Sequence, residues 1–267
     1  MNPVGASIHV SFRGSLREFL SYAEDEALDY VEIKMDRAEL VRKLEDRSSL
    51  DILKDDLSSF ELRYTLHAPY IDVNLSSINP EIGKASERVV ERTIRVASSI
   101  GAETITVHAG RLSRDYSKSL IPFAREKLIN RLLNLRALAE EFGVMLSLEN
   151  DHSSTNWTIA SSPDQLVYLI ERTGCGFTFD VGHANTVTDP SSFLNVLGDR
   201  IVLVHLHDND GTKDSHLAIG DGKINFRLLL SRMKRIRYQG PFILEVHKLE
   251  GLKRSVRALR TLIRGAR

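Results

Sequence analysis

The sequence predicts an α/β protein that forms a single (β/α)8 TIM barrel, with its active site at the C-terminal ends of the strands. Three observations predict this fold. Eight strand patterns alternate with helical patterns, and no linker or low-complexity stretch interrupts them. The chain has 267 residues, and one such barrel takes about 250. Six of the strand patterns carry Asp, Glu or His at or near their C-terminal ends.

The alternation also decides how the strands are connected. Strands of about six residues that are separated by helices pair in parallel through right-handed crossovers, and eight such units close into a barrel. A doubly wound open sheet is the competing arrangement, but it would not bring six strand ends around one centre. We therefore expect one domain over residues 1–267.

Capping and stop residues mark the elements of the first half. Ser15, with Glu18 three residues later, forms a capping box that starts a helix. Pro69 stops the third strand, and Gly101 and Gly143 are typical of the position after a helix end. The expected strands are 7–12, 30–35, 62–67 and 104–108, and the expected helices are 16–26, 38–59, 80–100 and 119–142.

The second half continues the alternation. In the sixth strand, phenylalanines alternate with polar residues from Phe177 to Asp180, so one face is apolar and the other polar. His183 is expected in the loop just past this strand. The expected strands are 144–149, 177–181, 201–207 and 242–247, and the expected helices are 164–172, 190–197, 226–236 and 249–263.

The composition argues against several classes of protein. Lys and Arg number 36, as do Asp and Glu, so no net charge draws the chain to nucleic acid or membranes. The single Cys175 excludes an internal disulfide and is expected to be a buried structural thiol. No segment has the pattern of a signal peptide, and no apolar stretch reaches about 18 residues. These features predict a cytoplasmic protein.

Six strand ends carry residue types that bind divalent metals. They are His67, His108, Glu149, Asp180, His205 and Glu245. Imidazole nitrogens and carboxylate oxygens are ligands for ions such as Zn²⁺. Asp180 with His183 alone would be weak support, because hydrogen-bonded Asp–His pairs occur in many loops. Six such strand ends together predict a metal site at one end of the barrel.

In combination, the motifs resemble the xylose isomerase-like TIM barrel superfamily. This superfamily contains sugar phosphate isomerases and epimerases and also endonuclease IV, or AP endonuclease family 2. The resemblance covers nearly the whole chain. Its motifs are Leu66-His-Ala-Pro-Tyr70, Val107-His-Ala-Gly110, Leu148-Glu-Asn150, Phe179-Asp-Val-Gly-His183, Val204-His-Leu-His-Asp208, Asp214-Ser-His216, Gly220-Asp-Gly222 and Leu244-Glu-Val246.

The isomerase and epimerase branch implies one divalent metal, zinc or manganese, held by Glu149, Asp180, His205 and Glu245. The resemblance implies that the two Glu also form the acid–base pair that moves a proton beside a sugar carbonyl. A metal polarises the carbonyl and hydroxyl oxygens, which acidifies the neighbouring C–H group. In this branch, His183 would contact the substrate.

The endonuclease IV branch implies three zinc ions held by nine residues, and each has a counterpart in this chain. The counterparts are His67, His108, Glu149, Asp180, His183, His205, Asp214, His216 and Glu245. Such a cluster clamps a phosphodiester and generates a hydroxide. Tyr70 falls where that family inserts an aromatic residue into DNA, and the implied partner is abasic duplex DNA.

Four departures from the nuclease pattern favour the sugar branch. The glycine-rich N-terminal motif of the nuclease is only partly matched by residues 6–14, and Glu32 resembles the second-strand Glu of the isomerases. Residues 180–185 match the sugar-enzyme version better. The pair Asp214 and His216 also occurs in sugar-isomerase relatives. Against the sugar branch, residues 211–213 lack the Arg that some ketose epimerases place there.

The leading prediction is therefore a metal-dependent isomerase or epimerase of a sugar or sugar phosphate, with Glu149 and Glu245 catalytic. A zinc-dependent AP endonuclease is the alternative, and a metal-binding barrel without catalysis is the third hypothesis. One to three ions per chain are expected. The candidate substrate-binding residues are His183, Glu32, Tyr70 and Trp157; packing under its loop is an equal interpretation of Trp157.

The remaining histidines and basic residues have simpler interpretations. His9 is expected to be a hydrogen-bonded barrel residue, and His152 a loop residue. His207 and His247 lie two residues beyond candidate ligands, hence on the same face, and either one is a candidate to orient a carboxylate. The basic final helix is expected outside the barrel, where solubility or contact in a homo-oligomer explains its charge.

Overall fold

A closed ring of parallel strands forms the centre of the molecule. The structure, a computed structural model, describes residues 2–9, 12–43 and 47–265. The barrel strands are β1 (Val4–Ile8), β2 (Tyr30–Lys34), β3 (Arg63–His67), β4 (Thr104–Val107), β6 (Met145–Glu149), β8 (Gly176–Asp180), β9 (Ile201–Leu206) and β10 (Phe242–Leu244). They pair in the order β1-β10-β9-β8-β6-β4-β3-β2, and β2 closes the ring on β1. The predicted (β/α)8 TIM barrel is confirmed.

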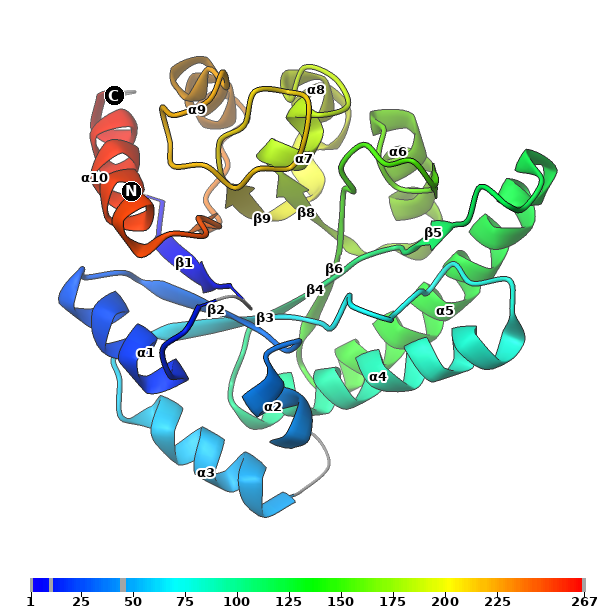
Figure 1. The fold of residues 1–267 in the computed structure, drawn as a ribbon, viewed down its shortest axis with the longest axis horizontal. Helices are drawn as coiled ribbons and strands as arrows, with labels where there is room; N and C mark the ends of the chain where they lie inside the picture. Colours follow the sequence, from blue (N-terminus) through cyan, green and yellow to red (C-terminus); the bar gives the residue numbers. More distant parts are fainter. Residues whose placement is uncertain (1, 10–11, 44–46, 266–267) are drawn as a thin grey trace.

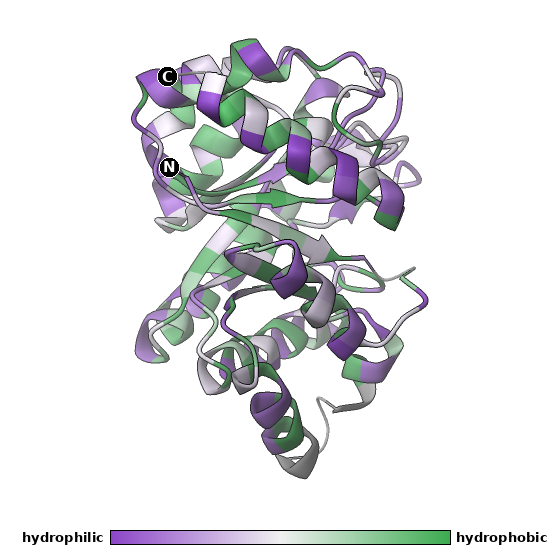
Figure 2. Ribbon diagram, turned by 90° about the vertical axis from the view of Figure 1, so that its left-hand side faces the viewer, coloured by the Kyte–Doolittle hydropathy of each residue, from purple (hydrophilic) through white to green (hydrophobic). Residues whose placement is uncertain are grey.

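Helices surround the barrel (Figure 1). They are α1 (Leu16–Asp25), α2 (Ala38–Lys43), α3 (Arg47–Ser58), α4 (Pro80–Ser99), α5 (Ile121–Glu141), α6 (Pro163–Thr173), α7 (Val181–Asn185), α8 (Ser191–Leu197), α9 (Phe226–Arg235) and α10 (Leu249–Gly265). Short 3-10 helices span Lys118–Leu120 and Gly198–Arg200. Hydrophobic residues are concentrated on the strands, whereas the helices also carry many hydrophilic ones (Figure 2). The main core therefore lies between the strands and the ring of helices.

The two faces of a barrel strand have different roles. Phe177 and Phe179 of β8 are fully buried, and their rings lie 6.3 and 5.7 Å from the ring of Phe193 in α8. On the other face, the Thr178 hydroxyl donates to Ser147 Oγ at 2.7 Å inside the barrel. Residues two apart on a strand share a face. The residues that follow Thr178 and Ser147 by two positions, Asp180 and Glu149, therefore point to the barrel axis.

The capping residues predicted for three helices, Ser15, Gly101 and Gly143, are confirmed. Ser15 caps α1, because its hydroxyl accepts from the Glu18 amide at 3.2 Å and its own amide donates to the Glu18 carboxylate at 2.7 Å. Gly101 and Gly143 come directly after Ile100 and Phe142, the C-cap residues of α4 and α5, and have φ angles of +71° and +68°. A side chain would strain the backbone in this left-handed region.

The prediction for the first strand was wrong in its position. The strand was expected at 7–12 but runs over Val4–Ile8. The Phe12 amide donates to the His9 carbonyl, so the chain turns after the strand, and residues 10 and 11 lie outside the described part. Gly5 explains the shift, because a Cβ there would collide with Tyr30 and Ile243 of the neighbouring strands.

Two other predictions need correction. The helix expected at 38–59 is divided into α2 and α3, with residues 44–46 outside the described part. His183 lies in the short helix α7 rather than in a loop, because the Asp180 carboxylate caps α7 by accepting from the His183 amide at 2.6 Å. Within the described ranges, no helix is both long and apolar enough to cross a membrane.

Candidate metal centre

Buried histidines and carboxylates converge at the C-terminal ends of the strands. His67, Glu149 and Asp180 end β3, β6 and β8, and His205 is the penultimate residue of β9. His108 and Glu245 follow directly on β4 and β10. Except for His108, these side chains are at most 4% exposed. The structure therefore brings together all six residues that the sequence places at strand ends.

Glu149 bridges two groups of histidines. Its Oε2 lies 3.2 Å from His67 Nε2 and 3.0 Å from His108 Nε2. Its Oε1 lies 2.9 Å from His205 Nδ1 and 3.6 Å from His183 Nδ1. Glu149 is therefore the carboxylate that connects the histidines at the ends of β3 and β4 with those at the ends of β8 and β9.

A second group surrounds His205. Its Nδ1 lies 2.9 Å from Glu149 Oε1, 3.6 Å from Glu245 Oε1 and 3.8 Å from Asp180 Oδ2. On the other side of the ring, Nε2 lies 3.0 Å from Glu32 Oε1. Among the described residues, Asp180 Oδ2 is buried and has no hydrogen-bond partner. A buried carboxylate oxygen without a donor needs a cation nearby.

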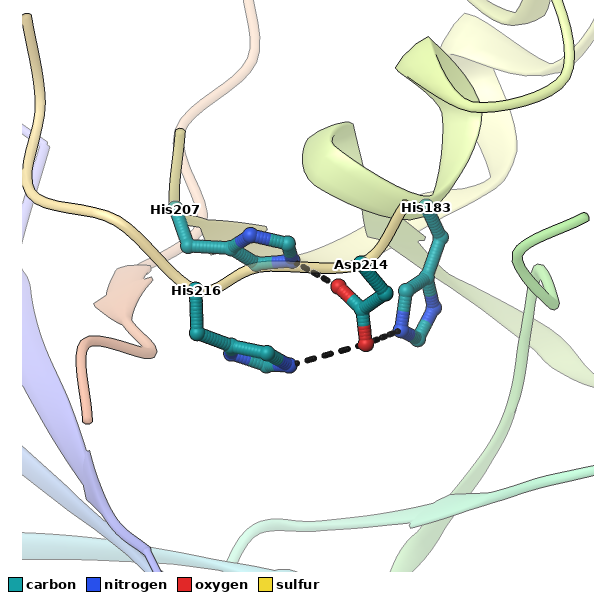
Figure 3. Close-up of side chains that lie close together, drawn as sticks. All are labelled: His183, His207, Asp214 and His216. Atoms are coloured by element: carbon teal, nitrogen blue, oxygen red, sulfur yellow. Dashed lines mark hydrogen bonds and ion pairs between the residues drawn. The ribbon is translucent and has the colours of Figure 1, made fainter. Parts of the chain in front are cut away.

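A third group lies towards the mouth of the barrel and contains His183, His207, Asp214 and His216 (Figure 3). Asp214 Oδ2 is 3.4 Å from His183 Nε2 and 3.0 Å from His216 Nε2, and its Oδ1 is 3.3 Å from His207 Nε2. Burial opposes the charge on Asp214, but His183 and His216 outweigh it and hold its pKa below the usual range. His207 was interpreted as a residue that orients a carboxylate, and its Nε2 also lies 3.2 Å from Asp180 Oδ1.

The outer nitrogens of the rings support a metal-binding role. His67, His183 and His216 each place Nδ1 2.8 Å from a backbone carbonyl, those of Ala68, Asn150 and Glu245. A carbonyl only accepts, so Nδ1 carries a hydrogen and donates it, which leaves Nε2, the nitrogen that faces a carboxylate, as the atom that would bind a metal. Metal-binding histidines in proteins are held in this way. The donor set of nitrogen and carboxylate oxygen fits zinc or manganese.

Lys34 is a part of the site that the sequence did not reveal as functional. It is the last residue of β2 and is 5% exposed, and its Nζ lies 2.9 Å from Glu245 Oε1. Burial disfavours the ammonium, but Glu245, Glu32 and Glu149 outweigh this cost and raise the pKa of Lys34. The position of Lys34 on the same strand face as Glu32 was the available signal.

A cavity of about 350 Å³ opens above this cluster, within the usual size range of small-molecule sites. Of the predicted site residues, His67, Tyr70, His108, Glu149, His183, Asp214, His216 and Glu245 line it. Asp180, His205 and Glu32 lie deeper and are fully buried. The Tyr70 ring packs 5.4 Å from the rings of both His67 and His108.

Trp157 does not line this cavity among its described residues. It lies in β7 (Trp157–Thr158), which pairs antiparallel with β5 (Arg111–Leu112), a two-stranded sheet that the sequence did not predict. Arg114 and Lys118 lie 4.7 and 5.8 Å from the centre of its ring. These contacts favour the packing interpretation of Trp157.

Three histidines with simpler interpretations also lie at the mouth. His9 and His152 line the cavity. The ring of His247 lies 3.9 Å from that of His9 and 4.3 Å from that of His216. This continues a column of rings, since His216 also stacks on His207 at 4.0 Å. The column joins residues on the segments that follow β1, β9 and β10, so no local pattern could have revealed it.

Comparison with known proteins finds similarity both to sugar enzymes and to nucleases. Residues 20–262 match the family described as xylose isomerase-like TIM barrel. An uncharacterised protein of Methanocaldococcus jannaschii is 33% identical over 240 residues, 87% of each chain. Another from the same organism is 32% identical over 70% of this chain and 65% of its own length. A probable endonuclease 4 of Mycobacterium tuberculosis is 29% identical over 80% of this chain and 84% of its own.

Solved structures share the fold across almost the whole chain. A D-tagatose 3-epimerase-like protein superposes with a TM-score of 0.89 at 26% identity, covering 99% of this chain and 98% of its own. An L-ribulose 3-epimerase has a TM-score of 0.81 at 16% identity, covering 100% of this chain and 96% of its own. A Thermus thermophilus protein soaked with zinc chloride has a TM-score of 0.77 at 24% identity, with 99% of both chains covered.

Proposed function

Because the chain belongs to the xylose isomerase-like TIM barrel family, we propose that it is a divalent-metal-dependent isomerase or epimerase of a sugar or sugar phosphate. One observation carries this proposal. Glu149 and Glu245 approach the same atom, His205 Nδ1, at 2.9 and 3.6 Å, and both line the cavity above it. The similarity to the D-tagatose 3-epimerase-like structure supports the same reaction class.

The metal would be held by Glu149, Asp180, His205 and Glu245, and when bound it would polarise the hydroxyl and carbonyl oxygens of the substrate. The two glutamates then exchange protons with the carbon beside the carbonyl. One removes a proton from this carbon, and the other returns a proton to the substrate. In an epimerase the second glutamate, which must be protonated, delivers its own proton to the opposite face of the same carbon. In an isomerase a proton is delivered to the neighbouring carbonyl carbon, and the hydroxyl proton moves to the carbonyl oxygen.

The surrounding residues keep Glu245 in its ionised form. Burial opposes its ionised form, but Lys34 and His205 outweigh this effect and hold the pKa of Glu245 well below its usual range. Lys34 also fixes the orientation of the carboxylate through the contact of 2.9 Å. His183 lines the cavity beside Glu149 and would contact a substrate hydroxyl.

Solvent exchange tests the proposal. The metal-loaded protein is incubated in D₂O with a panel of ketoses and their phosphates, and deuterium incorporation beside the carbonyl is measured by NMR. We expect incorporation with at least one substrate, none with Glu149→Gln, and loss of both metal and exchange with Glu245→Gln. If no sugar of the panel exchanges under zinc, manganese, magnesium or cobalt, the proposal fails.

A second candidate is a zinc-dependent AP endonuclease that cuts abasic duplex DNA. The observation in its favour is that all nine counterparts of the nuclease ligands lie in the three connected groups around Glu149, His205 and Asp214. The similarity to the probable endonuclease 4 points the same way. Elemental analysis separates the candidates, because two or three ions per chain together with incision would favour the nuclease. A barrel that binds metal without catalysis is the third candidate, and the paired glutamates argue against it.

A further inference from the structure

Arg111 stands where two cavities adjoin. One is the cavity of about 350 Å³ above the metal centre, and the other, of about 280 Å³, lies beside it under the connection from β4 to α5. Arg111, Asn74 and Asn156 line both cavities. A molecule bound over Glu149 can therefore extend towards Arg111.

The backbone of Arg111 is held in place by contacts on both sides. It pairs with Thr158 of β7, and its carbonyl accepts from Asn74 Nδ2 at 2.8 Å. The preceding Gly110 has a φ of +79°, and a Cβ there would collide with Asn74. Glycine thus allows the close approach that fixes Arg111 at the cavity junction.

The guanidinium group retains donors for a ligand. Its Nη2 donates to His152 Nε2 at 2.8 Å, while His152 Nδ1 donates to the Ser153 carbonyl at 2.6 Å. The same Nη2 lies 3.7 Å from Asp151 Oδ1, an oxygen that also contacts His108 Nδ1 at 3.0 Å. Within the described residues, Nε and Nη1 make no further hydrogen bond. Guanidinium nitrogens in a planar fork match the geometry of a phosphate group.

The charges along the cavity also favour an anion at this end. The floor already contains the carboxylates of Glu149 and Glu245, and the second cation of the wall, Lys34, is paired with Glu245. Arg114 and Lys118, on the same connection, lie over the ring of Trp157 and are not among the described residues that line either cavity. The floor of the cavity is therefore acidic, and Arg111 supplies the positive charge at its outer end.

We propose that Arg111 binds the phosphate of a phosphorylated sugar, with Asn156 beside it, so that the substrate is a sugar phosphate rather than a neutral sugar. This inference rests on the proposed isomerase or epimerase function. The ring of His152, which Arg111 contacts, lies 5.3 Å from the ring of His183 in the metal centre. One end of the sugar would lie at the glutamates and the phosphate at Arg111.

Polyols test the phosphate site without any turnover. D-Glucitol 6-phosphate and D-glucitol have no carbonyl, so their binding to the metal-loaded protein is measured by calorimetry independently of the reaction. We expect the phosphate ester to bind at least tenfold more tightly than the polyol. Arg111→Gln should remove this difference, Arg111→Lys should keep part of it, and the matched control Arg114→Gln should leave it unchanged.

Other outcomes overturn the proposal. Equal binding of the two polyols, or a preference that persists in Arg111→Gln with normal metal content, would exclude a phosphate site at Arg111. If an abasic duplex binds through Arg111 and the polyol phosphate does not, the ligand of Arg111 is a phosphate of DNA rather than that of a sugar phosphate. If the phosphate preference depends on Arg111 but no ketose phosphate exchanges deuterium, the phosphate site at Arg111 is supported. The proposed isomerase or epimerase function is then rejected.

Discussion

Lys34 Nζ lies 2.9 Å from Glu245 Oε1, and both side chains are buried beside the candidate metal centre. The ammonium balances part of the negative charge that Glu32, Glu149 and Glu245 bring into the barrel. A bound divalent ion would balance more of this negative charge, because it carries two positive charges. The stabilisation of the protein by the ion should therefore be larger when Lys34 is absent, and that by Lys34 larger when the ion is absent.

This relationship predicts the behaviour of Lys34→Met. Removing one partner of a buried ion pair costs about 3–5 kcal/mol, so the metal-free variant should melt well below the wild type. Adding Zn²⁺ should then raise the melting temperature of the variant more than that of the wild type. Calorimetry with and without metal measures both effects. Lys34→Arg, which keeps the charge, serves as the control, and an equal metal-induced rise in Lys34→Met and wild type would contradict the shared charge balance.

The protonation of His108 predicts how metal binding depends on pH. Burial opposes its charge, but Glu149 and Asp151 outweigh this and raise the pKa of His108 from 6.5 to about 9 in the metal-free protein. The stabilisation from the charged ring is thus complete below pH 6.5 and is lost as the pH rises through about 9. Metal binds the neutral ring, so metal affinity should rise over the same range.

Proton release measures this coupling. Calorimetric titration with Zn²⁺ at pH 7.5 in buffers of different ionisation enthalpy gives the number of protons released per ion. We expect net release, and less of it in His108→Gln. Binding that releases no protons at this pH would mean that the histidines around Glu149 are already neutral.

Gly182 provides a test of the packing behind the third histidine group. It lies in α7, where alanine is favoured over glycine by about 1 kcal/mol, so helix propensity alone predicts that Gly182→Ala stabilises the protein. A Cβ at this position, however, would overlap the ring of His207. Overpacking of this kind typically costs about 1–3 kcal/mol, so we expect Gly182→Ala to lower stability.

A double-mutant cycle separates the two effects. In a His207→Ala background the overlap is removed, and Gly182→Ala should become neutral or stabilising. Urea denaturation of the four proteins gives the interaction free energy. The same destabilisation in both backgrounds would show that the ring of His207 does not limit this position.

The sequence was sufficient for the barrel and for the strand-end residues because both depend on local patterns. Asp180 and Glu149 follow small polar residues on the same strand face, so the period of two that identifies the strand also directs them inward. The first strand was misplaced because residues 7–12 show the same apolar alternation as the true strand. The pairing of residues 4–8 with β10 and β2, in which Gly5 is aligned with Ile243 and Tyr30, identifies the correct segment.

Residues on the connections were harder to predict. Arg111 of β5 and His152, in the connection between β6 and β7, are hydrogen-bonded although they are 41 residues apart in sequence. Neither belongs to a periodic segment. Lys34 lies on a recognised strand, but its role depends on Glu245, which is adjacent only because the barrel closes. Contacts of this kind follow from the closed topology and leave no trace in any single stretch of sequence.

Tyr70 distinguishes the two candidate functions. Its ring lies 5.4 Å from those of His67 and His108, and the Tyr70 amide donates to the Asp36 carboxylate at 2.9 Å, so the ring is held over one side of the cavity. If the protein is a sugar enzyme, Tyr70→Ala should widen the cavity and raise KM for the sugar. Neither the wild type nor the variant should then bind an abasic duplex. For a nuclease, Tyr70→Ala should weaken binding of an abasic duplex with little change in metal content.

The salt dependence of binding completes this test. If the protein is a nuclease, it has to bind DNA phosphates through a local group of basic residues, because the whole chain has no net charge. Its affinity for an abasic duplex should then fall steeply as the salt concentration rises. Fluorescence anisotropy at several salt concentrations measures this slope, and Tyr168→Ala on α6 is the matched control. Tyr70→Ala removes a ring rather than a charge, so it should lower the affinity at every salt concentration while leaving the slope unchanged. Duplex binding that is unaffected by Tyr70→Ala, together with one ion per chain and no incision, would eliminate the nuclease.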